Sequence, residues 1–246
     1  MVKIRPGETL TEMRTVDCRD CGKSFEYEHC SAFETSREFC DGCAAKSAET
    51  WQRGRQTSIR ALNATVAKQI VPAEMRTAEI GGDSDPSRFP TSAWQAAQDW
   101  TSGNLGIVGP SGRCKTRMLY AVLTRWMLDS PKKLDLSAAD AVTMAEFKML
   151  AASRFDDRER YYRIRCCSVL ILDDVDKVTL TEDGASALFN VVDFRKTRRK
   201  PILWSSNASD SAALIAAMSA KLDATTRDAA IVPIVRRLVE GIIAST

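Results

Sequence analysis

The sequence lacks an apolar run long enough to span a membrane, a signal-peptide pattern and a strong excess of charge of either sign. Its first 15 residues contain no apolar stretch of the signal-peptide kind, and no run of about 18 or more apolar residues follows. The net charge is only +3, so composition alone does not require a nucleic-acid or acidic partner. We expect a cytoplasmic protein with no membrane partner, in which 246 residues provide one core-bearing domain and a small module.

One short stretch has the residue order of a phosphate-binding loop. An apolar run at residues 105–108 precedes a turn, and a helical apolar pattern follows it. The predicted nucleotide-binding residues of this stretch are Gly109, Pro110, Ser111, Gly112, Arg113, Cys114, Lys115 and Thr116. Glycines let backbone N–H groups turn toward phosphate oxygens, and the helix N-terminus adds partial positive charge. We predict that Lys115 reaches the β- and γ-phosphates of ATP and that Thr116 binds Mg²⁺.

Cys114 stands where the motif has its last glycine. If the backbone there requires a glycine-type conformation, the cysteine costs roughly 1 kcal/mol or more. Two interpretations therefore stay open. The protein is an ATPase that hydrolyses ATP to ADP and phosphate, or it is a scaffold that binds ATP without turnover.

Two later strands end in polar side chains that suit the same site. Residues 169–172 form a continuous apolar run that ends in Asp173 and Asp174, as a buried parallel strand does. We predict that Asp173 holds Mg²⁺ and that Asp174 polarises the attacking water. A third strand at residues 201–206 ends at Asn207, whose side chain is suited to orient that water.

Eight cysteines in a chain without an export signal indicate metal binding or packing rather than disulfides. Cys18 and Cys21 form one C-x2-C pair and Cys40 and Cys43 a second, with 18 residues between the pairs. This spacing predicts a four-cysteine zinc site in a ribbon at residues 16–44. The few aromatic residues between the pairs cannot make a core alone, so zinc would supply folding energy. His29 or Cys30 could replace one ligand, although we favour their lying on the strands away from the metal.

Basic residues gather in three segments. A helix at residues 44–70 carries an apolar stripe at Ile59, Leu62, Val66 and Ile70, with basic side chains elsewhere. Arginines recur at residues 158–165, and five of the six residues at 195–200 are basic. Such segments can bind DNA phosphates, or they can be solvated surface. We predict domains at residues 1–44 (zinc ribbon), 45–82 (basic helix and linker) and 83–246 (ATPase), with the boundary in the turn-rich stretch 81–86.

The remaining segments are expected to add two helices and a strand to the ATPase domain. A helix at residues 92–101 is expected to pack its tryptophans on the ATPase domain, and we expect a strand near residues 134–136 and a helix over 139–154. Only 39 residues follow Asn207 (246 − 207), too few for a full helical lid. We therefore expect a neighbouring subunit to cover part of the nucleotide and to supply an arginine to the γ-phosphate. Arg237 is the favoured residue and Arg236 the alternative.

Together these motifs resemble the DnaC/IstB group of AAA+ ATPases. The resemblance rests on G-P-S-G-x-x-K-T-R, L-I-L-D-D-V-D-K, Ser205-Ser206-Asn207 and I-V-R-R-L-V-E, and it covers roughly residues 72–244. It implies an α/β P-loop fold with a parallel sheet, ATP-dependent assembly into a homo-oligomer on DNA, and a protein partner bound by the N-terminal region. On this pattern Lys115, Thr116, Asp173, Asp174, Asn207 and Arg237 match the Walker A, Walker B, sensor 1 and arginine-finger positions.

The partner is expected from the same resemblance. Helicase loaders of the DnaI type place a zinc-binding module before the ATPase, so the cysteine pairs favour a replication protein that recruits a replicative helicase. A transposition helper, similar to IstB and bound to a transposase, is the alternative.

Overall fold

A computed structural model describes residues 11–30, 37–76, 91–152 and 157–246 of the chain. The chain divides into two compact units, Met1–Ser58 and Ile59–Thr246. The expected boundary at residues 81–86 lies outside the described residues. The division between the two units lies between Ser58 and Ile59, inside the helix at Asp41–Ile70.

The first unit is a hairpin followed by the start of a long helix. Strands β1 (Thr11–Asp17) and β2 (Ser24–Cys30) pair antiparallel, and helix α1 spans Asp41–Ile70. Phe25 and Tyr27 are two positions apart on β2, so their side chains lie on the same face of the hairpin. Their ring centroids are 6.1 Å apart. Helix α1 was predicted from residue 44. Its earlier start places Cys43 in the first helical turn.

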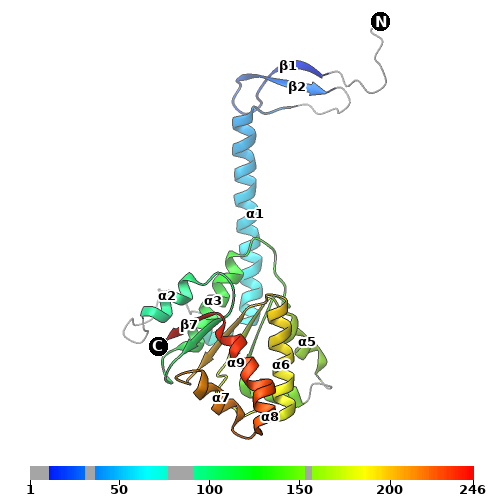
Figure 1. The fold of residues 1–246 in the computed structure, drawn as a ribbon. Coiled ribbons are helices and arrows are strands. Elements are labelled where there is room, and N and C mark those ends of the chain that lie inside the picture. The colour runs from blue at the N-terminus through cyan, green and yellow to red at the C-terminus, as the bar shows by residue number, and fades with distance from the viewer. Residues whose placement is uncertain (1–10, 31–36, 77–90, 153–156) are drawn as a thin grey trace, which may run out of the picture. The chain divides into compact units, whose positions relative to one another are not determined.

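The second unit is built on a five-stranded parallel sheet in the order β4-β5-β6-β3-β7. Figure 1 shows this unit, with β7 and most of its helices labelled. The strands are β3 (Leu105–Val108), β4 (Ala139–Thr143), β5 (Val169–Asp173), β6 (Ile202–Ser206) and β7 (Ile242–Ser245). Because all neighbours are parallel, their carboxyl ends meet at one edge of the sheet and their amino ends at the other. The predicted α/β fold with a parallel sheet is confirmed.

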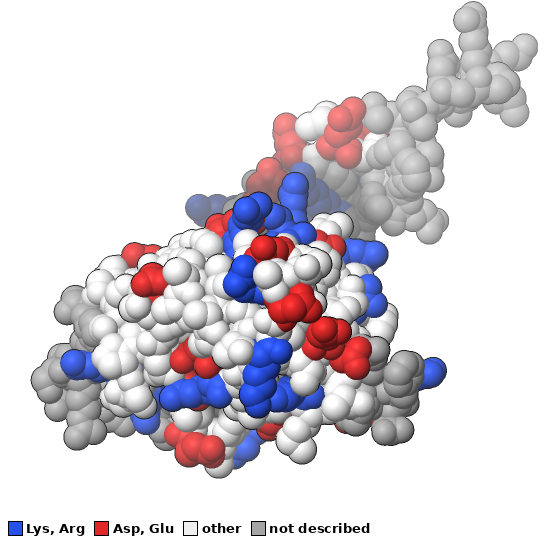
Figure 2. Space-filling model, turned by 60° about the horizontal axis from the view of Figure 1, so that its bottom comes forward, with Lys and Arg blue, Asp and Glu red and all other residues white. Residues whose placement is uncertain are grey.

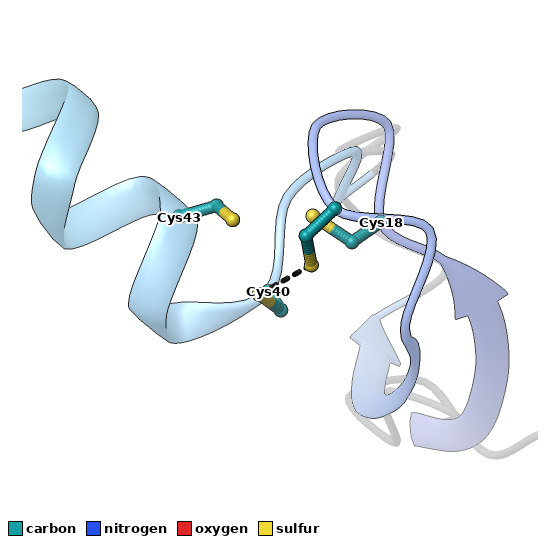
Figure 3. A group of neighbouring side chains, drawn as sticks. Cys18, Cys40 and Cys43 are labelled. Carbon is teal, nitrogen blue, oxygen red and sulfur yellow. Dashed lines mark hydrogen bonds between the residues drawn. The ribbon is translucent and has the colours of Figure 1, made fainter.

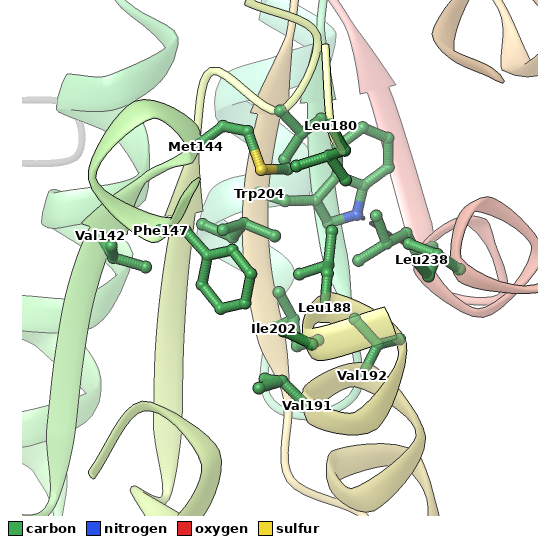
Figure 4. Close-up of a cluster of buried hydrophobic side chains, with 14 of the residues drawn as sticks. Val142, Met144, Phe147, Leu180, Leu188, Val191, Val192, Ile202, Trp204 and Leu238 are labelled. Carbon is green, nitrogen blue, oxygen red and sulfur yellow. Dashed lines mark hydrogen bonds between the residues drawn. The ribbon is translucent and has the colours of Figure 1, made fainter. Parts of the chain in front are cut away.

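Helices cover both faces of this sheet. They are α2 (Thr91–Asp99), α3 (Lys115–Asp129), α4 (Met144–Ala152), α5 (Arg158–Cys166), α6 (Glu182–Thr197), α7 (Ser211–Ser219), α8 (Ala224–Thr226) and α9 (Val232–Val239), with a 3-10 turn at Ala73–Met75 and a π-helical turn at Arg227–Ile231. One buried cluster joins α4, α5, α6, α7 and α9 to the sheet around Trp204 (Figure 4). A second joins the C-terminal part of α1, α2 and α3 to the other face. Trp100 is buried in this second cluster, as predicted for the helix at 92–101.

The expectation for residues 134–154 is wrong in its boundaries. The strand is β4 at Ala139–Thr143 rather than near 134–136, and the helix begins only at Met144. Thr143 and Glu146 exchange hydrogen bonds, since Glu146 Oε2 accepts from the Thr143 N–H at 2.9 Å and Thr143 Oγ1 accepts from the Glu146 N–H at 3.2 Å. This capping box fixes where the strand ends and the helix starts.

The part of α1 that belongs to the second unit, from Ile59 on, packs there through a polar residue. Asn63 is fully buried. Its amide donates to the carbonyls of Met127 and Lys132, both at 3.0 Å, and its oxygen accepts from the Leu134 N–H at 2.8 Å. Leu62, expected on the packing stripe, is instead 47% exposed. Among the described helices, α1 included, none combines the length and the apolarity needed to cross a membrane.

Candidate nucleotide site and cysteine cluster

The loop from Gly109 to Cys114 joins β3 to α3, at the carboxyl edge of the sheet. Gly109 has φ +144°, and a Cβ on it would lie 2.0 Å from Thr246 Oγ1. Gly112 also has a positive φ, +83°. Both positions therefore need glycine, and Gly112 lies in an open, exposed part of the loop.

Cys114 adopts the left-handed conformation, with φ 52° and ψ 29°, directly before α3. Glycine enters this region without a steric penalty, whereas an L-residue with a Cβ pays about 1 kcal/mol or more. The side chain is half-buried and packs against the cluster that includes α2 and α3. The usual motif has glycine at this position because the backbone is left-handed there. Cys114 adopts the same backbone conformation at an energetic cost.

Lys115 lies in the first turn of α3 and is 6% exposed. Its Nζ donates to the carbonyls of Gly109 at 2.9 Å and Pro110 at 3.0 Å, and to Asn207 Oδ1 at 2.9 Å. Burial lowers the pKa of Lys115, although the nearby charges of Asp174 and Asp176 act in the opposite direction. The ammonium group therefore joins the loop to the end of β6.

Thr116 and Asp173 meet between α3 and β5. The Thr116 hydroxyl donates to Asp173 Oδ2 at 2.8 Å. A hydroxyl and a carboxylate oxygen this close are ligands of the kind that Mg²⁺ prefers, since it takes oxygen ligands from one or two carboxylates and the substrate phosphates. These two residues could hold Mg²⁺ beside the phosphate-binding loop.

Ser205, a fully buried residue of β6, orders both carboxylates at the end of β5. Its hydroxyl donates to the second oxygen of Asp173 and accepts from the Asp174 N–H at 2.9 Å. Asp174 has a positive φ of 54°, and burial together with the Asp173 charge raises the pKa of its carboxyl. Sequence reasoning gave Ser205 no role, although it lies in the Ser205-Ser206-Asn207 run that marked the strand.

Asp176 is a second residue that sequence reasoning left without a role. Its carboxylate accepts from the Asn207 N–H at 2.8 Å and from the Asn207 side-chain amide at 3.3 Å. Burial alone would raise the pKa of Asp176, but the hydrogen bonds from Asn207 and Ser206 outweigh it and lower the pKa. Asp176 fixes the amide so that Asn207 Oδ1 faces Lys115. In the sequence, the feature that could have pointed to this residue is its place as the third aspartate of L-I-L-D-D-V-D-K, directly after the strand that carries Asp173.

The structure thus brings Lys115, Thr116, Asp173, Asp174 and Asn207 together at adjacent strand ends. Arg237 is not among them. It lies on α9, where Nη2 pairs with Asp193 at 2.6 Å, Nη1 donates to the Pro233 carbonyl at 3.1 Å, and the guanidinium lies 4.9 Å from the Phe189 ring centroid. Arg237 lines a hollow beside Asn104, Pro201 and Gly241. These residues precede β3, β6 and β7, so Arg237 belongs to the amino edge of the sheet.

The four cysteines Cys18, Cys21, Cys40 and Cys43 form one cluster in the first unit, between the hairpin turn and the start of α1 (Figure 3). Their sulfurs all lie within 4.8 Å of one another, and Cys21 Sγ is 3.8 Å from Cys40 Sγ. A tetrahedral zinc site with bonds of about 2.3 Å puts sulfurs about 3.8 Å apart. The thiols therefore fit zinc.

Backbone and thiol hydrogen bonds set unequal pKa values within this cluster. The backbone N–H of Cys40 is the main cause that lowers the pKa of Cys18, to about 6. Hydrogen bonds with the Cys21 and Cys40 thiols raise the pKa of Cys43 to about 12. His29 is outside the cluster, with Nδ1 3.8 Å from Glu12 Oε1. The Cys30 side chain lies outside the described part of the chain.

Some side chains of the basic segments are buried or paired with carboxylates. Arg195 is fully buried, and its guanidinium donates to the carbonyls of Ile164, Cys167 and Pro201 at 2.7–3.1 Å. Arg195 is therefore a structural residue that cannot contact DNA as it stands. Arg163 pairs with Asp140 at 2.7 Å. On the face in Figure 2, basic and acidic side chains of the described residues alternate.

No protein-family model matches the sequence, and no curated protein sequence matches it. Solved structures do match the fold. DnaI is 17% identical, covering 71% of this chain and 94% of that chain with a TM-score of 0.55. The DnaC helicase loader is 13% identical, covering 71% and 99% with a TM-score of 0.51.

A DNA replication initiation factor is 15% identical, with a TM-score of 0.52 over 69% of this chain. The match spans about half of that protein, 49% of its chain. Identities this low establish the fold and nothing beyond it. Over about 71% of its length the chain therefore shares its fold with the DnaI and DnaC structures, as the motif resemblance predicted.

Proposed function

We propose that this protein is an ATP-hydrolysing AAA+ protein of DNA replication, which assembles with ATP on DNA and recruits a replicative helicase. The observation that supports it most is the hydrogen-bonded set of Lys115, Thr116, Asp173 and Asn207 at adjacent strand ends. The helicase assignment rests on the fold shared with a helicase loader and on the cysteine cluster.

Each residue has a distinct role in the proposed reaction. Lys115 leaves the loop carbonyls and binds the β- and γ-phosphates, because a phosphate oxygen is a stronger acceptor for an ammonium group than a carbonyl. Thr116 and Asp173 would hold Mg²⁺, which would supply positive charge against the charge that develops on the phosphates. Asp174 polarises the attacking water, which Asn207 orients while Asp176 holds its amide in place.

Arg237, the favoured arginine of this reaction, would act on the nucleotide of another subunit. Arg237 lies at the amino edge of the sheet and the phosphate-binding loop at the carboxyl edge, so one chain cannot supply both. A contact between copies would bring them together, and hydrolysis would then depend on assembly. Arg236 is exposed, whereas Arg237 is held in a defined position by Asp193 and Phe189. This difference favours Arg237.

A scaffold that binds ATP without turnover is the second candidate, and the left-handed Cys114 is the observation that favours it. The experiment that separates the two measures ATP turnover with and without single-stranded DNA, together with equilibrium binding of ATP. The proposal expects turnover that rises with protein concentration and disappears in Asp174→Asn. Saturable ATP binding with no turnover at any concentration would contradict it and support the scaffold.

The partner requires a separate measurement. Affinity capture from the native host, with ATP present, is expected to recover a replicative helicase, and recovery should fall when the cysteine cluster is broken by Cys40→Ser. Recovery of a transposase instead would assign the protein to transposition.

A further inference from the structure

Helix α1 carries a large aromatic side chain in a stretch that is exposed all round. Residues 45–58, which belong to the first unit, are exposed on every side of the helix. Trp51 lies in the middle of this stretch and is 64% exposed. A helix that is exposed all round gains little stability from packing, so the core of the chain does not account for an indole at this position.

Arg55 lies one helical turn after Trp51 and contacts its ring. Residues four apart lie on the same face of a helix, and the guanidinium carbon of Arg55 is 5.4 Å from the ring centroid of Trp51. This distance is within the range of a cation–π contact. We use the name Trp51–Arg55 patch for these two side chains. The patch presents two planar groups, both of them exposed.

The carboxylates of α1 lie away from this patch. Glu49 is two residues before Trp51, and side chains two apart do not face each other on a helix. Glu49 pairs instead with Arg53 at 2.6 Å. Asp41, in the first turn of the helix, pairs with Arg37. Within the described part of the chain, no carboxylate pairs with Arg55, so its positive charge stays available beside the exposed indole.

The rest of this helix face is made of small side chains. At helical spacing from Trp51 it carries Ala44, Ser47, Ala48 and Ser58. A helix that pairs with another helix presents large apolar side chains at two positions of every heptad, through several heptads. One tryptophan among alanines and serines does not supply such a seam. The face therefore does not fit pairing with the same helix of a second copy.

An unpaired positive charge beside an exposed aromatic ring fits single-stranded nucleic acid. The bases of a single strand stack on aromatic side chains and on arginine planes, while basic side chains bind the phosphates. Small neighbouring side chains leave room for a base to lie against the indole. In a duplex the bases already stack on one another, so a duplex fits the Trp51–Arg55 patch less well.

We propose that the Trp51–Arg55 patch binds single-stranded DNA, with one base stacked on the Trp51 indole and Arg55 in contact with an adjacent phosphate. The inference rests on the proposed function only for the choice of DNA as the nucleic acid. It adds a DNA-binding site in the first unit, outside the candidate nucleotide site, and binding there does not require nucleotide at Lys115.

Fluorescence anisotropy of a labelled thymidine oligonucleotide, titrated with the zinc-loaded full chain without nucleotide, tests this directly. Trp51→Ala should weaken binding about tenfold, whereas Trp51→Phe should keep most of the affinity, because phenylalanine also stacks on bases. Arg55→Gln should weaken binding about threefold or more and reduce its salt dependence. Arg53→Gln, which removes an exposed arginine from another face of the same helix, is the matched control and should change the affinity by less than about twofold.

Intrinsic fluorescence supplies a second readout. The oligonucleotide should quench part of the tryptophan emission of the wild-type chain, and most of this quenching should be absent in Trp51→Phe although that variant still binds. Lys115→Ala should bind the oligonucleotide as the wild type does, because the patch lies outside the candidate nucleotide site.

The outcomes separate this inference from the proposed function. Wild-type affinity in Trp51→Ala would overturn the inference and leave the ATPase proposal intact. Tighter binding of a duplex than of the single strand would contradict stacking on Trp51. If Trp51→Ala changes the sedimentation of the chain but not its affinity for the oligonucleotide, the patch is a protein contact and the inference is wrong. Oligonucleotide binding that depends on Trp51 in a chain without ATP turnover would overturn the ATPase proposal alone.

Discussion

The left-handed Cys114 allows the steric cost of the phosphate-binding loop to be measured by two substitutions. Cys114→Ala keeps the Cβ and the strain but removes the sulfur that packs against α2 and α3. By analogy with one buried methylene, this loss is about 0.8 kcal/mol or less. Cys114→Gly also removes the strain, which raises the free energy of unfolding by about 1–2 kcal/mol. The greater freedom of glycine in the unfolded chain lowers it by about 0.4–1 kcal/mol.

These terms predict an unusual order of stability. The glycine variant should be about 1 kcal/mol more stable than the alanine variant and within about 1 kcal/mol of the wild type. In an ordinary helix the order is reversed, since glycine costs about 0.5–1 kcal/mol relative to alanine. Ala216→Gly, at an exposed position inside α7, is the matched control and should show this ordinary loss.

Urea unfolding of the metal-loaded chain, followed by circular dichroism, measures all four free energies of unfolding. Equilibrium binding of ATP to the same proteins should show that the glycine variant binds at least as tightly as the wild type, because no side chain is placed beside the phosphates. If the alanine variant proves as stable as the glycine variant, the backbone at Cys114 is not strained and this reasoning fails.

Three further results are expected. Because burial and the Asp173 charge raise the pKa of Asp174, the folded chain binds this proton more tightly than the unfolded chain, and the carboxylate opposes folding above the raised pKa. Asp174→Asn should therefore raise the free energy of unfolding near pH 7 and lose this advantage as the pH falls toward about 4; an advantage independent of pH would contradict the assignment. Asp176→Asn should lower kcat about tenfold or more with little change in KM, because a mis-set Asn207 affects the attacking water more than ATP binding; an unchanged kcat would remove Asp176 from the site. Cys40→Ser should abolish stoichiometric zinc binding, measured by metal release, and unfold the first unit while ATP binding persists; zinc retained at one per chain would show that the cluster is not the ligand set.

The residues of the candidate nucleotide site could be predicted from the sequence because each part of the pattern depends on local order along the chain. A strand, a turn and a helix place Lys115 and Thr116 without long-range information, and a buried strand that ends in carboxylates identifies Asp173 and Asp174. Parallel strands with crossover helices then bring these ends to one edge. The cluster of four cysteines could likewise be predicted, since the spacing of the two C-x2-C pairs indicates a four-cysteine site.

Residues whose roles depend on contacts across the sheet were not predictable in this way. Ser205 orders the two carboxylates of a neighbouring strand, and Arg195 caps carbonyls from α5 and from the start of β6. Nothing in a basic run reveals that one member is buried. The short edge strand β7 was also missed, because its four residues carry little apolar periodicity and three are exposed.

The boundary error at residues 134–154 has a different cause. The capping box at Thr143 and Glu146 was present in the sequence but was not recognised, so the helix was expected to begin at residue 139. Pairing of β4 with β5 overrode this local preference.

The most direct test of the candidate site is magnesium-dependent binding of a non-hydrolysable ATP analogue, measured by calorimetry on the zinc-loaded chain. A single site built from Lys115, Thr116 and Asp173 predicts one nucleotide per chain, with affinity reduced at least tenfold by Lys115→Ala and with the magnesium dependence lost in Asp173→Asn. Unchanged binding in both variants, or no binding by the wild type, would contradict it.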